Sequence, residues 1–281
     1  MNLKDIRSAF VTELNDIYDA EEALSIFYVV AEELTGIKKI NIILSLENVV
    51  PDEDEKRYHE VLGKLKQGIP VQQILGKALF YQMNFKVSAD VLIPRPETEE
   101  LVEWILTDAG GKDLLKVLDI GTGSGCIAIS LQKHLNHANT DALDVSMQAL
   151  EIAKYNAQIN SATIDFIEAD ILRYDKEQQY DIIVSNPPYI TDAEKSDMRD
   201  NVMLHEPHLA LFVDDPDPLL FYKAISDYAK KNLASGGRLY FEINELFGQE
   251  TVEMIKAKGF TNIELKKDMQ GKARMVGCSQ P

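Results

Sequence analysis

The sequence has few cysteines and no long apolar run. Only two cysteines, Cys126 and Cys278, occur among its 281 residues, so we expect no disulfide framework and a reducing, cytoplasmic location. No apolar stretch approaches the roughly 18–20 residues that span a bilayer. The first residues, Met1 to Asp5, lack the charged-then-apolar order of a signal peptide. These absences predict a cytoplasmic protein with no membrane partner.

Basic side chains are also scarce. The chain carries 29 Lys and Arg against 46 Asp and Glu, a formal net charge of −17. A negative field repels polyphosphate, which counts against direct binding of nucleic acid and favours a protein or small-molecule substrate. The hydrophobic fraction of 45% is that of an ordinary globular protein, and the length leaves room for two domains.

Residues 1–75 are predicted to form a small helical domain. Apolar residues recur at three- and four-residue spacing in the first helix, Asp19 is placed to cap a second helix that Gly36 ends, and a third begins at Pro51 and stops at Gly68. This segment contains eight basic and fourteen acidic residues. It is therefore either a substrate-docking domain for a basic partner or a helical bundle with a solvated acidic surface.

In residues 76–93 the helical spacing of apolar residues ends. The new pattern predicts a β-hairpin linker, with Gln82-Met83-Asn84 between its strands. A domain of residues 94–281 follows. It opens with a stiff Pro-x-Pro segment that carries Arg95, Glu97 and Thr98 into a helix. These three side chains form either a mixed surface cluster or the rim of a site.

From Lys116 onward strands and helices alternate, which is typical of a mostly parallel sheet with helices on both faces. Residues 190–216 have little periodicity and predict a long loop. The strands are expected near 116–120, 139–144, 163–168, 180–185, 237–243, 261–266 and 273–277, and the helices near 124–135, 146–159, 217–232 and 247–258.

A glycine-rich turn follows the first of these strands. Glycine at every second position lets the backbone approach a ligand closely, and the N-terminus of the next helix attracts an anionic group. The spacing Asp-x-Gly-x-Gly-x-Gly is tighter than the Gly-x-Gly-x-x-Gly of dinucleotide-binding folds. The residues that this turn offers to a cofactor are Asp119, Gly121, Thr122, Gly123, Ser124 and Gly125.

The next two strands each lead to an aspartate. Asp144 is placed to accept hydrogen bonds from both hydroxyls of a ribose, and Asp170, with Ile171 beside it, suits the amino group and the face of an adenine. Each aspartate alone is more often a helix cap. Because ligands of open α/β sheets bind beyond the carboxyl ends of the strands, the three acids together predict a cofactor site.

The fourth strand ends in the unusual run Asn186-Pro187-Pro188-Tyr189. Pro187 forces Asn186 out of the helical region, and two prolines remove two N–H donors. The Asn186 side-chain oxygen and the Pro187 carbonyl are then acceptors that suit an NH2 group, with Tyr189 as a flat wall. An isolated Asn-Pro pair is usually only a turn; the cofactor motif upstream favours a site.

These motifs resemble those of class I S-adenosylmethionine-dependent methyltransferases that methylate amino groups. The run from Val91 to Glu99, which contains Arg-Pro-Glu-Thr-Glu, is similar to the peptide chain release factor glutamine methyltransferase family. Supporting matches are Glu206-Pro207 with Ala210-Leu211, and Glu242 with Gly248. The resemblance covers essentially the whole chain and implies a Rossmann-like seven-stranded sheet behind a helical N-terminal domain.

The resemblance also implies the chemistry. S-adenosylmethionine would donate its methyl group to the side-chain N5 of the glutamine in the Gly-Gly-Gln motif of class 1 release factors, leaving S-adenosylhomocysteine. Asn186 and Pro187 would hold the amide, and Asn186 would contact the cofactor as well. Tyr189 and Pro188 would pack beside the amide, and Arg95, Glu97 and Thr98 would shape the methionine end of the cofactor or the entrance for glutamine. No metal is expected, although His205 and His208 have metal-like spacing.

Two alternatives stay open at this point. Asn-Pro-Pro-Tyr also occurs in adenine methyltransferases that act on DNA or RNA, but these need a recognition domain and a basic groove that the sequence lacks. The second alternative is a binding module that keeps the methyltransferase fold without catalysis. Intact Asn186, Asp144 and glycines argue against it.

Overall fold

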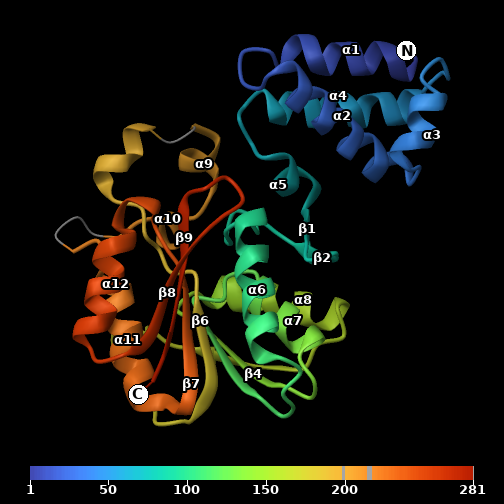
Figure 1. Ribbon diagram of the computed structural model, residues 1–281. Helices are drawn as coiled ribbons and strands as arrows, with labels where there is room; N and C mark the ends of the chain where they lie inside the picture. Colours follow the sequence, from blue (N-terminus) through green and yellow to red (C-terminus); the bar gives the residue numbers. More distant parts are fainter. Residues whose placement is uncertain (198–199, 214–216, 281) are drawn as a thin grey trace. The chain divides into compact units, whose positions relative to one another are not determined.

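The computed structural model describes residues 1–197, 200–213 and 217–280, which form two compact units (Figure 1). The smaller unit consists of Met1–Gly76 together with helix α9 (Asp200–His205). The larger unit begins at Lys77 and contains the other described residues. In the described part of the chain, no helix combines the length and apolarity needed to cross a membrane.

The smaller unit is helical around a buried aromatic core. Phe10 and Phe27 are fully buried, and their rings meet edge to face with centroids 5.7 Å apart. Asp19 accepts hydrogen bonds from two backbone N–H groups at the start of the second helix, and Gly36 ends it with φ 69°, as predicted. Two short helices, α3 and α5, were not predicted, because they are too short to show a periodic pattern in the sequence. The helices of residues 1–76 are α1 (Leu3–Glu13), α2 (Ala20–Thr35), α3 (Lys39–Leu44), α4 (Asp52–Leu65) and α5 (Val71–Leu75).

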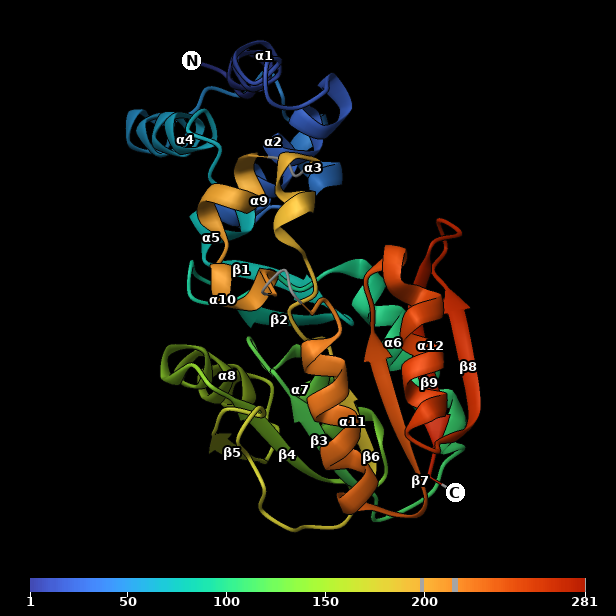
Figure 2. The same ribbon diagram turned by 90° about the vertical axis from the view of Figure 1, so that its left-hand side faces the viewer.

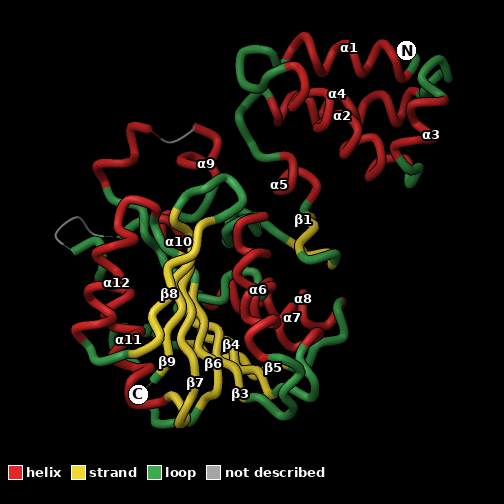
Figure 3. The backbone as a smooth tube through the Cα atoms, viewed as in Figure 1, coloured by secondary structure: helices red, strands yellow, loops and turns green. Residues whose placement is uncertain are grey.

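The larger unit contains the predicted seven-stranded sheet, in the order β5-β4-β3-β6-β7-β9-β8 (Figure 3). All neighbouring strands are parallel except that β9 runs antiparallel to both β7 and β8. Its strands are β3 (Lys116–Ile120), β4 (Asn139–Asp144), β5 (Ile164–Glu168), β6 (Tyr180–Ser185), β7 (Leu233–Glu242), β8 (Thr261–Lys267) and β9 (Ala273–Ser279). The fold class is therefore confirmed.

Register aligns the carboxyl ends of the parallel strands. Ile120, at the end of β3, pairs with Leu143 on β4 and with Ser185 on β6. Asp144 pairs with Glu168, the last residue of β5. The residues that follow these four strands therefore meet along one edge of the sheet, where open α/β sheets bind ligands.

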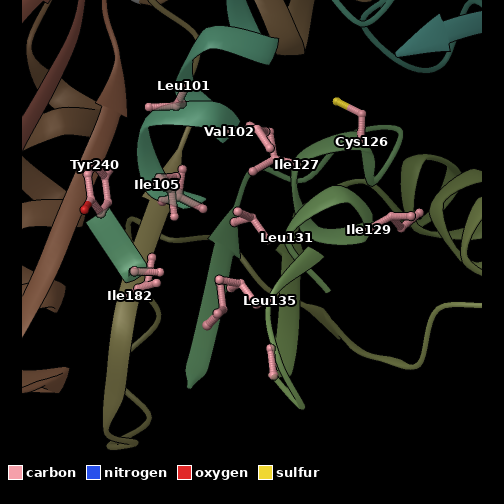
Figure 4. Close-up of a cluster of buried hydrophobic side chains, with 14 of the residues drawn as sticks. Leu101, Val102, Ile105, Cys126, Ile127, Ile129, Leu131, Leu135, Ile182 and Tyr240 are labelled. Atoms are coloured by element: carbon pink, nitrogen blue, oxygen red, sulfur yellow. The ribbon is translucent and has the colours of Figure 1, made fainter. Parts of the chain in front are cut away.

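Helices cover both faces of this sheet, and Figure 2 looks onto the face that α11 and α12 cover. Side chains alternate across each strand, so Val117 packs in the core beneath α6 and α7, whereas Leu118 packs beneath α11 and α12. Figure 4 shows the first of these cores, in which Leu101, Ile105 and Leu131 are fully buried. The helices are α6 (Pro96–Ala109), α7 (Cys126–His134), α8 (Met147–Ile159), α11 (Leu220–Asn232) and α12 (Gly248–Ala257).

The predicted hairpin is present as β1 (Lys77–Phe80) and β2 (Met83–Lys86), but its turn was misplaced. Phe80 pairs with Met83, so the two-residue turn is Tyr81-Gln82, with φ 47° and 61°, and not Gln82-Met83-Asn84. The strained turn is held in place because the Tyr81 N–H donates to Glu99. The hairpin groups with the larger unit; the domain boundaries at residues 75 and 93 stay predictions.

The prediction of one long loop over residues 190–216 was wrong for the part that the structure describes. Short helices occupy much of it: η1 (Asp192–Asp197), α9 and α10 (His208–Leu211). Helices of four to six residues are shorter than two turns, so they leave no periodic signal in the sequence. Residues 198–199 and 214–216 lie outside the described residues.

Candidate active site

A cavity of about 300 Å³ opens at the carboxyl edge of the sheet, a volume at the lower end of the range for small-molecule sites. It collects most of the residues predicted from the sequence, drawn from turns that are far apart in the chain. The predicted residues that line it are Arg95, Thr98, Gly121, Thr122, Gly123, Ser124, Asp144, Asp170, Ile171, Asn186, Pro187 and Pro188.

Four predicted site residues do not line the cavity. Asp119 is fully buried next to the glycine turn, and Gly125 caps the start of α7. Glu97 lies in the first turn of α6 and is partly exposed. The Tyr189 hydroxyl contacts Glu242 instead of the cavity. The cavity lining therefore supports direct contact with a cofactor or substrate for the first group, and not for Gly125, Glu97 or the Tyr189 hydroxyl.

The glycine turn presents its backbone to the cavity. Gly121 and Gly123 have φ of 72° and 54°, in the left-handed region where other residues are strained. The N–H groups of Gly121 and Thr122 donate to the Leu143 carbonyl at 2.7 and 3.0 Å, which ties the turn to the end of β4. A side chain at Gly123 would point into open space, so the absence of one leaves room for a ligand against the backbone.

Asp144, the last residue of β4, is one of the acidic side chains that line the cavity. Its Oδ2 accepts from the Gly123 N–H at 2.8 Å and its Oδ1 from the Ser146 N–H at 2.9 Å. Burial raises its pKa, and these backbone hydrogen bonds oppose that shift. Each carboxylate oxygen keeps acceptor capacity for a further donor. The fixed carboxylate therefore suits a vicinal diol such as that of a ribose.

Asp119 has one unsatisfied oxygen. Its Oδ2 accepts from the Thr122 hydroxyl at 2.6 Å and from the Ala128 N–H at 3.2 Å. Its Oδ1 is buried and has no hydrogen-bond partner among the described residues. Burial raises the pKa of this carboxyl to about 7. An unpaired carboxylate oxygen beside the glycine turn fits a cationic ligand group such as the α-ammonium of S-adenosylmethionine.

We expect Asp119→Asn to reduce the pH dependence of stability. The folded pKa of about 7 lies above the ordinary 3.8, so the folded protein binds this proton more tightly than the unfolded chain. The free energy of unfolding therefore falls as pH rises between these two values. Urea unfolding at pH 5 and pH 8 should show a smaller decrease in the variant than in the wild type.

The control for this prediction is Asp165→Asn, at an exposed position on β5. It should keep the wild-type decrease in the free energy of unfolding. A decrease of wild-type size in Asp119→Asn as well would contradict the titration that we assign to Asp119.

The run Asn186-Pro187 brings two free acceptors to the cavity wall. Ser185, the last residue of β6, donates its hydroxyl to the Ile120 carbonyl at 2.7 Å, which fixes the point where the run begins. Among the described residues, neither the Asn186 side chain nor the Pro187 carbonyl has a hydrogen-bond partner, and both residues line the cavity. Acceptors left unpaired in this way are available to an N–H2 group.

The stretch that contains Arg95 forms another part of the wall. Arg95 donates to the buried carboxylate of Glu206 at 2.5 Å, and the Ile93 N–H donates to its second oxygen at 3.4 Å. Glu206 and Pro207, which support the family resemblance in the sequence, thus both lie next to the cavity. Glu206 holds Arg95, and Pro207 lines the wall. Thr98, in the first turn of α6, donates to Glu242 at 2.6 Å.

Sequence reasoning missed Asn156, a buried residue of α8 that supports the glycine turn. Its Nδ2 donates to the Ser124 carbonyl at 2.9 Å and to the Lys86 carbonyl at 3.0 Å, while its Oδ1 accepts from the Lys86 N–H at 2.6 Å. No periodic signal marks such a residue, since its partners are remote in sequence. Cys126, which belongs to the hydrophobic core beneath α6 and α7, also lines the cavity.

Asp170 and Ile171 lie on the cavity wall beyond β5, as predicted. The Asp170 Oδ1 accepts from the Leu172 N–H at 2.9 Å, so it also stabilises its own turn. Within residues 1–197, 200–213 and 217–280, no group of three or more His, Cys, Asp or Glu side chains is arranged to hold a metal ion.

Comparison with protein families matches two parts of the chain. Residues 98–212 match the methyltransferase small domain, and residues 5–76 match the PrmC N-terminal domain. Among solved structures, a methyltransferase from Pyrococcus furiosus is similar with a TM-score of 0.55 at 18% identity, covering 78% of this chain and 98% of that one. This similarity shows the fold: that of the class I methyltransferases.

Two curated relatives match over nearly their whole length. The release factor glutamine methyltransferase of Flavobacterium psychrophilum is 47% identical, covering 98% of both chains. That of Bacteroides thetaiotaomicron is 42% identical, covering 95% of this chain and 96% of the relative. Identity of this degree over this length, together with the cavity described above, shows that the chain belongs to the release factor glutamine methyltransferase family.

Proposed function

We propose that the protein transfers the methyl group of S-adenosylmethionine to the side-chain N5 of the glutamine in the Gly-Gly-Gln motif of class 1 peptide chain release factors. The names of its relatives support this substrate over adenine and over a function without catalysis. The observation that carries the proposal is the pair of free acceptors, the Asn186 side chain and the Pro187 carbonyl, on the cavity wall.

These two acceptors match the needs of the amide. An amide nitrogen is a weak nucleophile because its lone pair is delocalised into the carbonyl. Hydrogen bonds from its two N–H groups to the Asn186 oxygen and the Pro187 carbonyl orient the nitrogen and stabilise the positive charge that develops on it. Bound S-adenosylmethionine supplies a methyl group on a sulfonium, a leaving group that needs no protonation. One of the two amide protons is finally lost to solvent.

The order of the strands supports the placement of the cofactor. Asp170 and Ile171 follow β5, Asp144 ends β4, the glycine turn follows β3 and Asn186 follows β6, in the sequence of neighbours β5-β4-β3-β6. In S-adenosylmethionine the adenine is bonded to the ribose and the ribose to the sulfonium, which carries both the methyl group and the rest of the methionine. Adenine beyond β5, ribose at β4, and the two other groups of the sulfonium beyond β3 and β6 follow this connectivity. We assign Asp144 to the ribose hydroxyls and Asp119 to the α-ammonium, with the glycine turn against the methionine.

We assign substrate docking to the helical unit of residues 1–75. Its excess of acidic residues suits a basic protein surface. Three aliphatic side chains of α3, Ile40, Ile43 and Leu44, are exposed as well, and such clusters often contact other proteins. A release factor acts in translation, so we place the reaction in the cytoplasm.

The test uses S-adenosylmethionine with a labelled methyl group. Purified protein is incubated with a class 1 release factor, with the same factor carrying Gln→Ala in Gly-Gly-Gln, and with adenine-containing DNA. We expect label in the first protein alone, and mass spectrometry should place it on the glutamine side chain. Label in the DNA but not in the release factor would overturn the proposal.

A further inference from the structure

Glu242, the last residue of β7, is a buried carboxylate that does not line the cavity. Only 2% of its surface is exposed. Its Oε2 accepts from the Thr98 hydroxyl at 2.6 Å, and its Oε1 lies 3.4 Å from the Tyr189 hydroxyl, a longer hydrogen bond. One side chain therefore joins two elements that are distant in sequence.

One partner of Glu242 lines the cavity, and the other directly follows residues that do. Thr98 lines the cavity from α6. Tyr189 directly follows Pro187 and Pro188, and its carbonyl accepts from the Asn244 side chain at 3.0 Å. The end of β7 thus holds the tyrosine by its hydroxyl and by its backbone, which keeps the preceding acceptors in place.

A purely structural role explains this carboxylate poorly. A buried charge is costly, and well-packed apolar residues often stabilise a fold as well as a buried charged pair does. Burial raises the pKa of Glu242, while the Thr98 hydroxyl and Arg274 oppose the shift. A geometric role accounts for the residue better, since a carboxylate can fix two hydroxyl groups at once in defined directions.

We infer that Glu242 is a positioning residue of the methyl transfer, which fixes Thr98 and Tyr189 so that the Asn186 and Pro187 acceptors face the methyl donor. This inference rests on the proposed function. It concerns the acceptor half of the cavity alone, because the residues assigned to the cofactor lie on or just after β3, β4 and β5, and none of these strands neighbours β7 in the sheet.

The test compares Glu242→Gln, Thr98→Val and the double variant. Glu242→Gln keeps the shape of the side chain but replaces one of the two acceptor oxygens by a donor. We expect kcat for the release factor to fall about 10- to 100-fold, since small displacements of reacting groups cost that much. The Kd of S-adenosylmethionine should stay within about twofold, and the double variant should lose less than the product of the two single effects.

Asp141→Asn is the matched control. Asp141 is also buried and accepts from a tyrosine hydroxyl, that of Tyr180 at 2.7 Å, but it does not line or support the cavity. Its Oδ2 also accepts from the Gln178 side chain at 2.6 Å. Asp141→Asn should therefore lower Tm by weakening these buried hydrogen bonds, while kcat stays within about twofold of the wild type. Loss of kcat in proportion to Tm in both Asp141→Asn and Glu242→Gln would overturn the inference.

Two further outcomes separate the inference from the function on which it rests. A wild-type protein that does not label the glutamine refutes the proposed function itself. If the wild-type protein labels the glutamine and folded Glu242→Gln has an unchanged kcat, the positioning role alone is refuted. Should Glu242→Gln fail to fold, Thr98→Val decides: a lowered kcat at unchanged Kd for S-adenosylmethionine supports the inference, and an unchanged kcat overturns it.

Discussion

Replacing Asn186 with alanine is expected to lower kcat for release factor methylation about 100- to 1,000-fold, the cost of losing a preorganised hydrogen-bonding group at a reacting centre. The side chain makes no hydrogen bond to the described protein, so its loss leaves no structural partner unsatisfied. Stopped assays with labelled methyl donor measure kcat, and the Kd of S-adenosylmethionine should change little.

Asn186→Asp tests whether the acceptor oxygen is what matters. Aspartate keeps an oxygen at the same distance from the backbone but has no N–H2 group. We expect this variant to retain more turnover than Asn186→Ala. Turnover of Asn186→Ala equal to that of the wild type would refute the role of this residue. If the affinity for S-adenosylmethionine fell along with turnover, Asn186 would be assigned to cofactor binding instead.

The elements that carry the site could be predicted because their signals are local. Apolar runs reveal β3 to β6, and the glycine turn, the two aspartates and the Asn-Pro-Pro run at or just beyond their ends fall at the same edge once the strands are parallel. That reasoning brought Asp144, Asp170 and Asn186 together correctly. The two prolines indicated what the site binds, since a backbone without N–H groups offers only hydrogen-bond acceptors.

The supporting residues could not be predicted, because their partners are distant in the chain. Asn156 meets Ser124 only after α8 packs beside the glycine turn, and Glu242 meets Thr98 only after β7 has joined the sheet. Nor does the sequence reveal that the Tyr189 hydroxyl turns away from the cavity to Glu242. Such contacts depend on tertiary packing, whereas periodicity and turn chemistry describe a few neighbouring residues at a time.

The second large effect is expected for Asp144→Ala, in the affinity for S-adenosylmethionine. The substitution removes the acceptors assigned to the ribose hydroxyls and leaves the N–H groups of Gly123 and Ser146 without their partner. Hydrogen bonds to a charged group contribute about 1.5–3 kcal/mol each, so loss of both weakens binding by at least about 100-fold. Isothermal titration of the folded variant with S-adenosylhomocysteine measures the change.

Glu168→Ala is the natural control, because Glu168 is paired in register with Asp144 on the next strand, yet it is exposed and does not line the cavity. Both substitutions remove one negative charge from the same edge of the sheet. If long-range electrostatics governed cofactor binding, the two variants would change the Kd by similar factors. A direct contact predicts a large loss for Asp144→Ala and a change within about twofold for Glu168→Ala, since exposed charges are screened by solvent and salt.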